Sequence, residues 1–313
     1  MLVVDEVVSN ITALVNDTSD GKLVMDTRTK IRGRVMFLEL FKKHAVVTSE
    51  CQFTIAVWPS RSRARSTRSL ESESQCCSNP PTLDAASGAG HVENLAGFNT
   101  YVSGSLESKH ALLLVSDGFG YEAPNLRKLA DEVAAAGFYV VVPDFFYGEP
   151  YVVDNPIPAW LNDHDPAKGF DDAKLIIDAL KSKEVSSIGA AGFCWGAKVV
   201  VELSKVALIQ AAVMLHPSFV TVDDIKNVKV PIAILGAEDD HMSPPELTEQ
   251  FDEIVKASEV DSFVKIFPKC SHGWAVRYDV NDPTSVDCAS EAHKDMLEWF
   301  TKYVNSGNYP TTE

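Results

Sequence analysis

Residues 185–206 read VSSIGAAGFCWGAKVVVELSKV, and they are the strongest indication of the fold class in the chain. The small and apolar residues up to Ala191 predict a short buried strand, and residues 197–206 predict a helix. Between them lies Gly192-Phe193-Cys194-Trp195-Gly196, whose two glycines permit a tight, strained turn. The pattern predicts a nucleophile elbow with cysteine in place of the usual serine. The alternative is a small buried cysteine in a glycine-rich turn.

The composition bounds the class of protein. The chain has 313 residues, of which 45% are hydrophobic, so it can form one large domain or two smaller ones. Residues 75–313 contain 35 acidic and 17 basic residues. Such an acidic surface repels phosphate backbones and anionic headgroups, so no nucleic-acid or membrane partner is expected.

The six cysteines are too few to form a disulfide framework in a chain of this length. The first residues, MLVVDEVVSN, lack the basic start of a secretory signal, and no apolar run reaches the length of a membrane span. These features predict a cytoplasmic protein with reduced thiols, as a monomer or weak homodimer.

The chain changes character near residue 75. Residues 61–74 read RSRARSTRSLESES, a tract that cannot bury a core. We therefore expect residues 1–74 to be a poorly ordered extension without a catalytic role. A start at Met36 would instead give an Arg- and Ser-rich segment with some likeness to an organellar transit peptide.

Residues 75–313 alternate apolar runs with amphipathic stretches, which predicts an α/β fold: a mostly parallel sheet covered by helices on both faces. The long loop 144–165, rich in proline and aromatic residues, is long enough to be functional. The expected strands are 98–104, 111–116, 138–143, 185–191, 211–216, 230–236 and 263–268, and the expected helices are 124–137, 167–183, 197–206, 245–257 and 289–304.

Two later segments supply partners for a cysteine nucleophile. In sheets of this class the order along the chain is nucleophile, acid, histidine. Asp240 follows one late strand and His272 follows the next, so Cys194, Asp240 and His272 have the order of a catalytic triad. The neighbouring Asp239 remains an alternative to Asp240. His272 as an ordinary surface-loop histidine is the other reading.

Other chemistries fit the spacing less well. His216, His241, His272 and Cys270 lack the paired spacing of a zinc site, so neither a metal nor an organic cofactor is expected. A glycosidase needs two facing carboxylates. Acidic residues are so abundant here that candidates such as Asp144 discriminate little.

At these motifs the chain resembles the dienelactone hydrolase family of the α/β-hydrolase fold, and its plant branch in particular. The similar stretches are SQCCSNPPTL (74–83), SDGFGYEAPNLRKLADEVAAAGFYVVVPDFFYGEP (116–150), GFCWGAK (192–198) and KCSHGWAVRY (269–278). The resemblance implies a dienelactone hydrolase-like domain over residues 75–313 and leaves residues 1–74 outside it.

The resemblance also implies roles for individual residues. Cys194 would be the nucleophile, His272 the base and Asp240 the acid that orients His272. The backbone N–H groups of Gly118 and Trp195 would form the oxyanion hole. Asp117 stands where bacterial members have a glutamate that modulates the thiol, and it is one methylene shorter; a simple loop cap is its alternative role.

The same resemblance suggests substrate contacts. Arg277 could hold a substrate carboxylate, although a solvated surface role is equally open. The loop 144–165 contains no second arginine to match the bacterial pattern. Tyr147 and Trp274, with Tyr151 and Trp160, could line an apolar pocket, although aromatic residues are more often part of a core.

The function expected from these features is hydrolysis of small activated esters or enol-lactones through an acyl-thiol intermediate. One rival is hydrolysis of cell-wall β-glucan, because some plant relatives are named endo-1,3;1,4-β-glucanase. The other rival is a non-catalytic protein that binds a small ligand.

Overall fold

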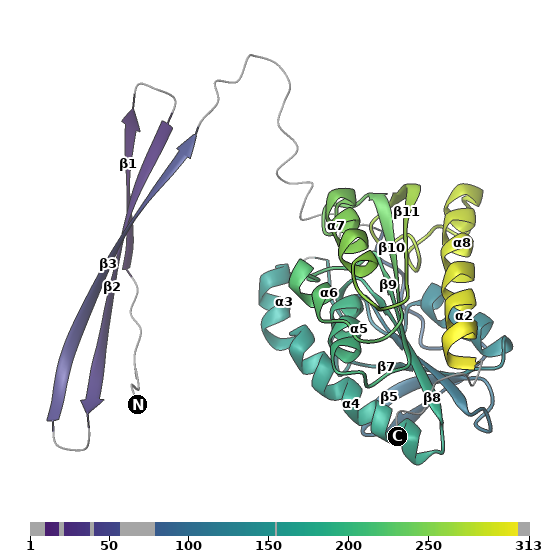
Figure 1. The fold of residues 1–313 in the computed structure, drawn as a ribbon. Coiled ribbons are helices and arrows are strands. Elements are labelled where there is room, and N and C mark those ends of the chain that lie inside the picture. The colour runs from purple at the N-terminus through teal and green to yellow at the C-terminus, as the bar shows by residue number, and fades with distance from the viewer. Residues whose placement is uncertain (1–9, 19–21, 38–40, 57–78, 154, 306–313) are drawn as a thin grey trace. The chain divides into compact units, whose positions relative to one another are not determined.

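The structure is a computed structural model that describes residues 10–18, 22–37, 41–56, 79–153 and 155–305. The chain divides into two units, Met1–Ser66 and Thr67–Glu313, and each is described by itself (Figure 1). Within the first unit, three strands form an antiparallel sheet in the order β1-β2-β3. These strands are β1 (Asn10–Thr18), β2 (Lys22–Phe37) and β3 (Phe41–Ala56).

The expected extension, residues 1–74, therefore contains strands in its described part. Residues 57–74, with the Arg- and Ser-rich tract, lie outside the described residues.

The second unit is built on an eight-stranded sheet in the order β11-β10-β9-β8-β6-β7-β5-β4. Neighbouring strands pair in parallel from β11 through β10, β9, β8 and β6 to β7. β5 pairs antiparallel with both β7 and β4. The predicted fold class, mostly parallel α/β, is confirmed. The strands are β4 (His91–Leu95), β5 (Phe98–Ser103), β6 (His110–Val115), β7 (Tyr139–Pro143), β8 (Ser187–Phe193), β9 (Ala211–Leu215), β10 (Ile232–Asp239) and β11 (Ser262–Ser271).

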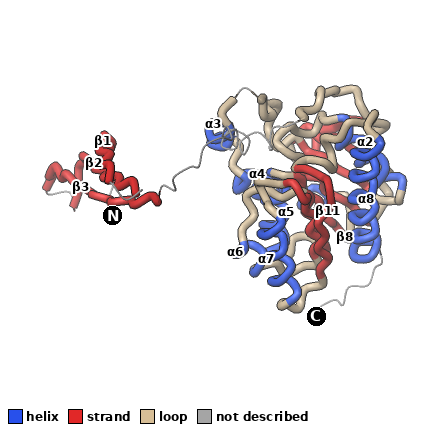
Figure 2. The backbone as a smooth tube through the Cα atoms, turned by 90° about the horizontal axis from the view of Figure 1, so that it is seen from above, coloured by secondary structure: helices blue, strands red, loops and turns tan. Residues whose placement is uncertain are grey.

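Helices cover both faces of this sheet (Figure 2). α4, α5, α6 and α7 lie on one face, and α2 and α8 lie on the other. The central strands are apolar at nearly every position because both of their faces are buried. The helices are α2 (Pro124–Ala135), α3 (Ile157–Asp163), α4 (Pro166–Ser182), α5 (Trp195–Lys205), α6 (Val222–Lys226), α7 (Pro245–Lys256) and α8 (Pro283–Phe300), followed by a π-helical turn, η2 (Thr301–Asn305).

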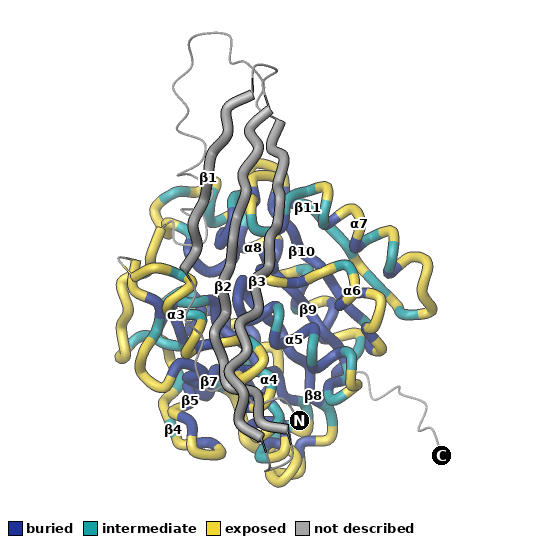
Figure 3. Tube along the Cα trace, turned by 90° about the vertical axis from the view of Figure 1, so that its left-hand side faces the viewer, coloured by how far each residue is buried: buried dark blue, intermediate teal, exposed yellow. Residues whose placement is uncertain are grey.

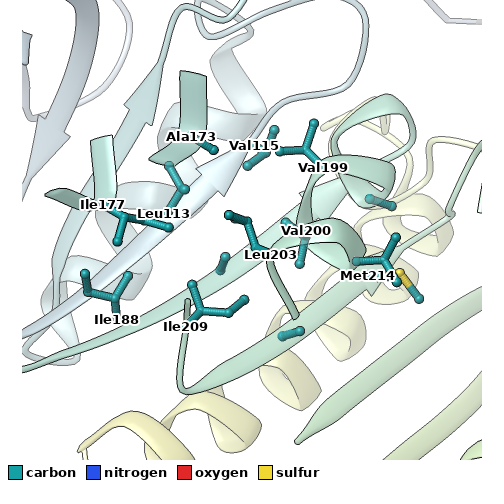
Figure 4. Packing of buried hydrophobic residues seen from close by; sticks show 14 of the residues in the cluster. Leu113, Val115, Ala173, Ile177, Ile188, Val199, Val200, Leu203, Ile209 and Met214 are labelled. Carbon is teal, nitrogen blue, oxygen red and sulfur yellow. The ribbon is translucent and has the colours of Figure 1, made fainter. Parts of the chain in front are cut away.

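The core beneath α4 and α5 consists largely of aliphatic side chains. Figure 4 shows Leu113 and Val115 of β6 facing Ala173 and Ile177 of α4, with Val199 of α5 close by. Figure 3 shows the central strands of the eight-stranded sheet as mostly buried and many of the surrounding loops as exposed. This packing fixes the carboxyl ends of β6, β8, β9, β10 and β11 at one edge of the sheet, where α/β enzymes bind their ligands.

Three short elements were not expected from the sequence. β4 is an edge strand of five residues, and α3 occupies part of the expected loop 144–165 without burying a residue. α6 has only five residues and is held by a capping box between Thr221 and Asp224. α8 begins at Pro283 instead of near residue 289, because the Asp282 side chain caps it by accepting from the Thr284 and Ser285 N–H groups.

The elbow glycines generate a stability prediction. A Cβ at Gly196 would overlap the carbonyl oxygen of Val115, so Gly196→Ala forces α5 away from β6. We expect it to lower the free energy of unfolding by about 1–3 kcal/mol, measured by urea denaturation. The matched control is Ala207→Gly, the opposite substitution, just beyond the other end of α5. Ala207 is exposed and has φ 54°, a backbone conformation that glycine adopts more easily than alanine. Ala207→Gly should leave stability unchanged or raise it. Equal losses in the two variants would contradict the argument.

Candidate active site

Cys194 lies at the turn between β8 and α5, at the carboxyl end of a central strand. Its backbone has φ 51° and ψ −108°, a conformation that L-residues rarely adopt. Gly192 and Gly196 make the turn possible, since a Cβ on either would overlap neighbouring backbone. The Cys194 side chain is 1% exposed. The local sequence thus holds a buried thiol at the amino end of α5.

Asp240 and His272 come together from two neighbouring strands, after β10 and after β11 respectively. His272 Nδ1 lies 2.8 Å from Asp240 Oδ2, and both side chains are buried. The other oxygen of Asp240 accepts hydrogen bonds from the N–H groups of Met242 and Ser243, at 2.8 and 3.0 Å. Asp239 is exposed, so Asp240 is the acid that faces His272.

This arrangement fixes the orientation of the His272 ring. Because Asp240 accepts at Nδ1, the lone pair of a neutral ring is at Nε2. Nε2 is buried, and Cys194 is a second side chain that interacts with His272 besides Asp240. Burial alone would lower the pKa of His272, but the charged form of Cys194 and the Asp240 carboxylate raise it to about 9.

The thiol has a second neighbour on the loop after β9. Cys194 Sγ lies 3.2 Å from Ser218 Oγ, within hydrogen-bonding distance, and both groups are buried. His216, two residues earlier, is fully buried, with its ring 5.1 Å from that of His272. Burial lowers the pKa of His216 to about 4, although the contact with Cys194 opposes this shift. His216 is therefore neutral at neutral pH.

From the sequence, His216 stands out only as a candidate zinc ligand, and no motif marks Ser218. The signal that could have found them is their position directly after β9, at the edge where Cys194, Asp240 and His272 also lie.

Asp117 and Arg277 form a buried ion pair, in which Arg277 Nε lies 3.3 Å from Asp117 Oδ2. The sequence suggested separate roles for them, modulation of the thiol and contact with substrate. Burial raises the pKa of Asp117 to about 6 against the opposing effect of Arg277, and the charge of Cys194 adds to the rise. The guanidinium packs so closely on Gly273 that a Cβ there would overlap it. Arg277 is thus engaged with Asp117 and is not a solvated surface residue.

Gly118 and Trp195, the expected oxyanion donors, both line a small cavity beside Cys194. The cavity volume is about 20 Å³, room for about one water molecule. Trp195 is the first residue of α5, so its N–H has no acceptor within the helix. The other residues around the cavity are Phe119, Tyr151, Ile157, Trp160, Leu161 and Phe219.

Two aromatic residues expected to contact substrate lie elsewhere. The Tyr147 hydroxyl donates to Asp172 at 2.7 Å, and the ammonium of Lys168 sits over the Tyr147 ring. Trp274 is buried against His216 and Phe267, and it lines a separate pocket together with His272 and Arg277. Neither Tyr147 nor Trp274 lines the cavity at Cys194, whereas Tyr151 and Trp160 do.

Cys270 and Cys288 form a disulfide that joins the end of β11 to α8. This differs from the expectation of reduced thiols, because the fold brings together two cysteines that are 18 residues apart. Cys270 is two residues from His272, so the bond ties the histidine loop to α8.

No group of three or more His, Cys, Asp or Glu side chains in the described residues could hold a metal ion. None of the helices in the same residues is long and apolar enough to cross a membrane.

A model of the dienelactone hydrolase family matches residues 98–304. The chain belongs to the dienelactone hydrolase family. This membership indicates a hydrolase that acts on esters or lactones. An endo-1,3;1,4-beta-D-glucanase of Zea mays is 42% identical over 199 residues, which cover 62% of this chain and 65% of the maize protein. The chain thus spans just under two thirds of that relative.

One further relative and one solved structure are also similar to this chain. A carboxymethylenebutenolidase homolog of Xenopus tropicalis is 36% identical over 204 residues, which cover 62% of this chain and 82% of the frog protein. The fold also matches the crystal structure of P91, a dienelactone hydrolase-like promiscuous phosphotriesterase from metagenomic libraries. Its TM-score is 0.55 at 17% identity, covering 68% of this chain and 96% of P91.

The low pKa of His216 predicts a pH dependence of stability. A histidine whose folded pKa is about 4 binds fewer protons in the folded than in the unfolded state, so its contribution is lost as pH falls from about 6.5 towards 4. His216→Phe should therefore reduce the loss of unfolding free energy between pH 7 and pH 5 by about 2 kcal/mol. Urea denaturation at both pH values measures this. The exposed His91→Phe should keep the wild-type loss, and an unchanged loss in His216→Phe would contradict the assignment.

The disulfide predicts a redox-dependent stability. Cys288→Ser should lower the free energy of unfolding by about 3 kcal/mol, because it removes a crosslink that closes a loop of 18 residues. Denaturation midpoints with and without dithiothreitol measure this. The reductant should destabilise the unmodified protein by a similar amount and leave the variant unchanged. A reductant effect of the same size in both proteins would contradict a Cys270–Cys288 bond.

Proposed function

We propose that the chain is a thiol hydrolase of small activated esters and enol-lactones. Cys194 is the nucleophile, His272 the general base and Asp240 the group that orients His272. The observation that carries the proposal is the buried 2.8 Å contact between Asp240 and His272, next to a thiol on a strained elbow. Nucleophile, base and orienting acid are the three parts that such catalysis requires.

The first step is transfer of the Cys194 proton to His272 Nε2. The raised pKa of His272 favours the imidazolium, and the amino end of α5 favours the thiolate. The thiolate then attacks the substrate carbonyl. The negative charge that develops on the carbonyl oxygen is held by the N–H groups of Gly118 and Trp195, which line the same cavity.

The remaining steps regenerate the thiol. The tetrahedral intermediate collapses, the C–O bond to the leaving group breaks, and His272 gives its proton to the leaving oxygen. Water, deprotonated by His272, then attacks the thioester, and Cys194 leaves with the free acid as product. A thiolate suits good leaving groups such as enols and phenols.

Arg277 has a balancing role in this proposal. Asp117 opposes the thiolate, and the Arg277 guanidinium 3.3 Å away offsets its charge. Arg277 is therefore assigned to Asp117 and not to a substrate carboxylate, and the substrate is neutral. We also propose a monomer or weak homodimer with no nucleic-acid or membrane partner, because the acidic charge of residues 75–313 repels phosphate groups and anionic headgroups.

The maize relative's name raises β-glucan hydrolysis as a second candidate. A glycosidase places two carboxyl groups on either side of the bond that it cleaves. Two carboxylates of the candidate site, Asp117 and Asp240, are both buried and are paired with Arg277 and His272 respectively. This arrangement favours the ester substrate over the glucan.

The nucleophile assignment is tested by Cys194→Ala. We expect kcat/KM for p-nitrophenyl acetate and for an enol-lactone to fall at least about 10³-fold. Asp240→Asn should lower kcat by a similar order, because it no longer fixes the ring of His272. Steady-state hydrolysis measures both, and circular dichroism with thermal melting checks that each variant is folded.

Three outcomes would overturn the proposal. The first is ester turnover that survives in folded Cys194→Ala. The second is hydrolysis of mixed-linkage β-glucan that survives in Cys194→Ala, which would favour the glucanase instead. The third is tight binding of an ester without turnover by the unmodified protein, which would favour the non-catalytic alternative.

A further inference from the structure

A groove between the amino end of α4 and the side of α5 adjoins the cavity at Cys194. Its volume is about 480 Å³. Two side chains, Leu161 and Phe219, line both the groove and the cavity. They therefore lie between the larger space and the buried thiol. The groove is lined by Leu161, Asp165, Pro166, Ala167, Phe170, Lys198, Glu202 and Phe219.

The cavity at Cys194 is too small to hold a whole substrate, so the adjoining groove matters for substrate binding. A space of about 20 Å³ holds about one water molecule, so a substrate carbonyl beside Cys194 has no room there for the rest of its molecule. Displacing Leu161 and Phe219 would open the groove to the thiol. Phe219 is 37% exposed, so its ring has space to turn.

The walls of the groove select for an apolar, uncharged ligand. Most of its wall is made of Leu161, Pro166, Ala167, Phe170 and Phe219. The described cation in the groove, Lys198, is already paired with Glu202 at 2.9 Å and with Asp224 at 2.7 Å. Two acids, Asp165 and Glu202, also line the groove and repel an anion.

The loop that carries Phe219 also contacts the thiol. Ser218 Oγ lies 3.2 Å from Cys194 Sγ, and the Ser218 N–H donates to the Cys194 carbonyl at 3.1 Å. Phe219 has φ 63°, a strained conformation for a non-glycine residue that recurs at ligand-binding sites. Phe219 directly follows Ser218, the residue that contacts the Cys194 thiol, so a movement of the Phe219 ring occurs next to that contact.

We propose that this groove binds the apolar arm of a neutral ester substrate, with Leu161 and Phe219 as the gate to Cys194. The inference rests on the proposed function, since the groove serves the thiol. It specifies the substrate class as esters with an aliphatic or aromatic arm of several carbons. It excludes substrates whose arm ends in a carboxylate.

Two substrate series test the groove in the full chain. In the acyl series, kcat/KM for p-nitrophenyl acetate, butyrate and hexanoate should rise about tenfold in total, because added methylenes leave water. In the alcohol series, phenyl acetate is compared with 4-butylphenyl acetate. A rise in either series supports the groove and assigns it to that arm. Two flat series would overturn it.

A blocking variant tests the location. Ala167→Trp fills the groove from α4. If the groove binds the acyl arm, the hexanoate-to-acetate ratio of kcat/KM should fall at least about fivefold, mainly through KM. If it binds the alcohol arm, the ratio of kcat/KM for 4-butylphenyl acetate to that for phenyl acetate should fall instead. Leu175→Trp is the matched control, since Leu175 is 51% exposed on the same helix and lines no cavity described above. It should keep the wild-type ratio. Equal ratios in the two variants would overturn the location.

The results for Cys194→Ala and for the two substrate series distinguish a failure of the groove proposal from a failure of the proposed thiol hydrolase. Acetate turnover that survives in Cys194→Ala removes the proposed function, whatever the substrate series show. Acetate turnover that depends on Cys194, together with flat series, leaves the thiol hydrolase in place and removes only the groove.

Discussion

The backbone at Cys194 is the constraint on which the rest of the site depends. A non-glycine residue at φ 51° costs of order 1–3 kcal/mol and persists only where its surroundings hold it. Here they do, since the Cys194 N–H donates to Leu215 and its carbonyl accepts from Ser218, both at 3.1 Å. The two glycines therefore make the elbow sterically possible, and the hydrogen bonds to β9 and to the loop after it hold the elbow in place.

Most of the fold and the order of the site residues could be predicted from the sequence, because both follow from local patterns. β6 and β7 are apolar at nearly every position, which marks them as buried strands, and Asp240 and His272 each come at or after the end of a late strand. The pairing of Asp117 with Arg277 could not be predicted, because it joins residues far apart in the chain that meet only through tertiary packing. The short helices α3 and α6 show too few turns for a helical period to stand out.

The charges around the thiol are arranged in partnered sets, as low-dielectric surroundings require. Asp240 faces His272, and Asp117 faces Arg277, with all four side chains buried. A thiolate formed at Cys194 meets the imidazolium of His272 as its own partner. Arg277 is already paired with Asp117, so its charge offsets a carboxylate that belongs to the protein itself.

The two buried histidines beside the thiol can be told apart by their surroundings. His272 has a carboxylate on one ring nitrogen, and its pKa rises to about 9. His216 has aromatic rings around it and no carboxylate contact within the described residues, and its pKa falls to about 4. Groups whose pKa values are driven apart in this way take different roles. At neutral pH, His216 is therefore neutral and packs against the ring of His272, whereas the carboxylate beside His272 favours the charged form of that second ring.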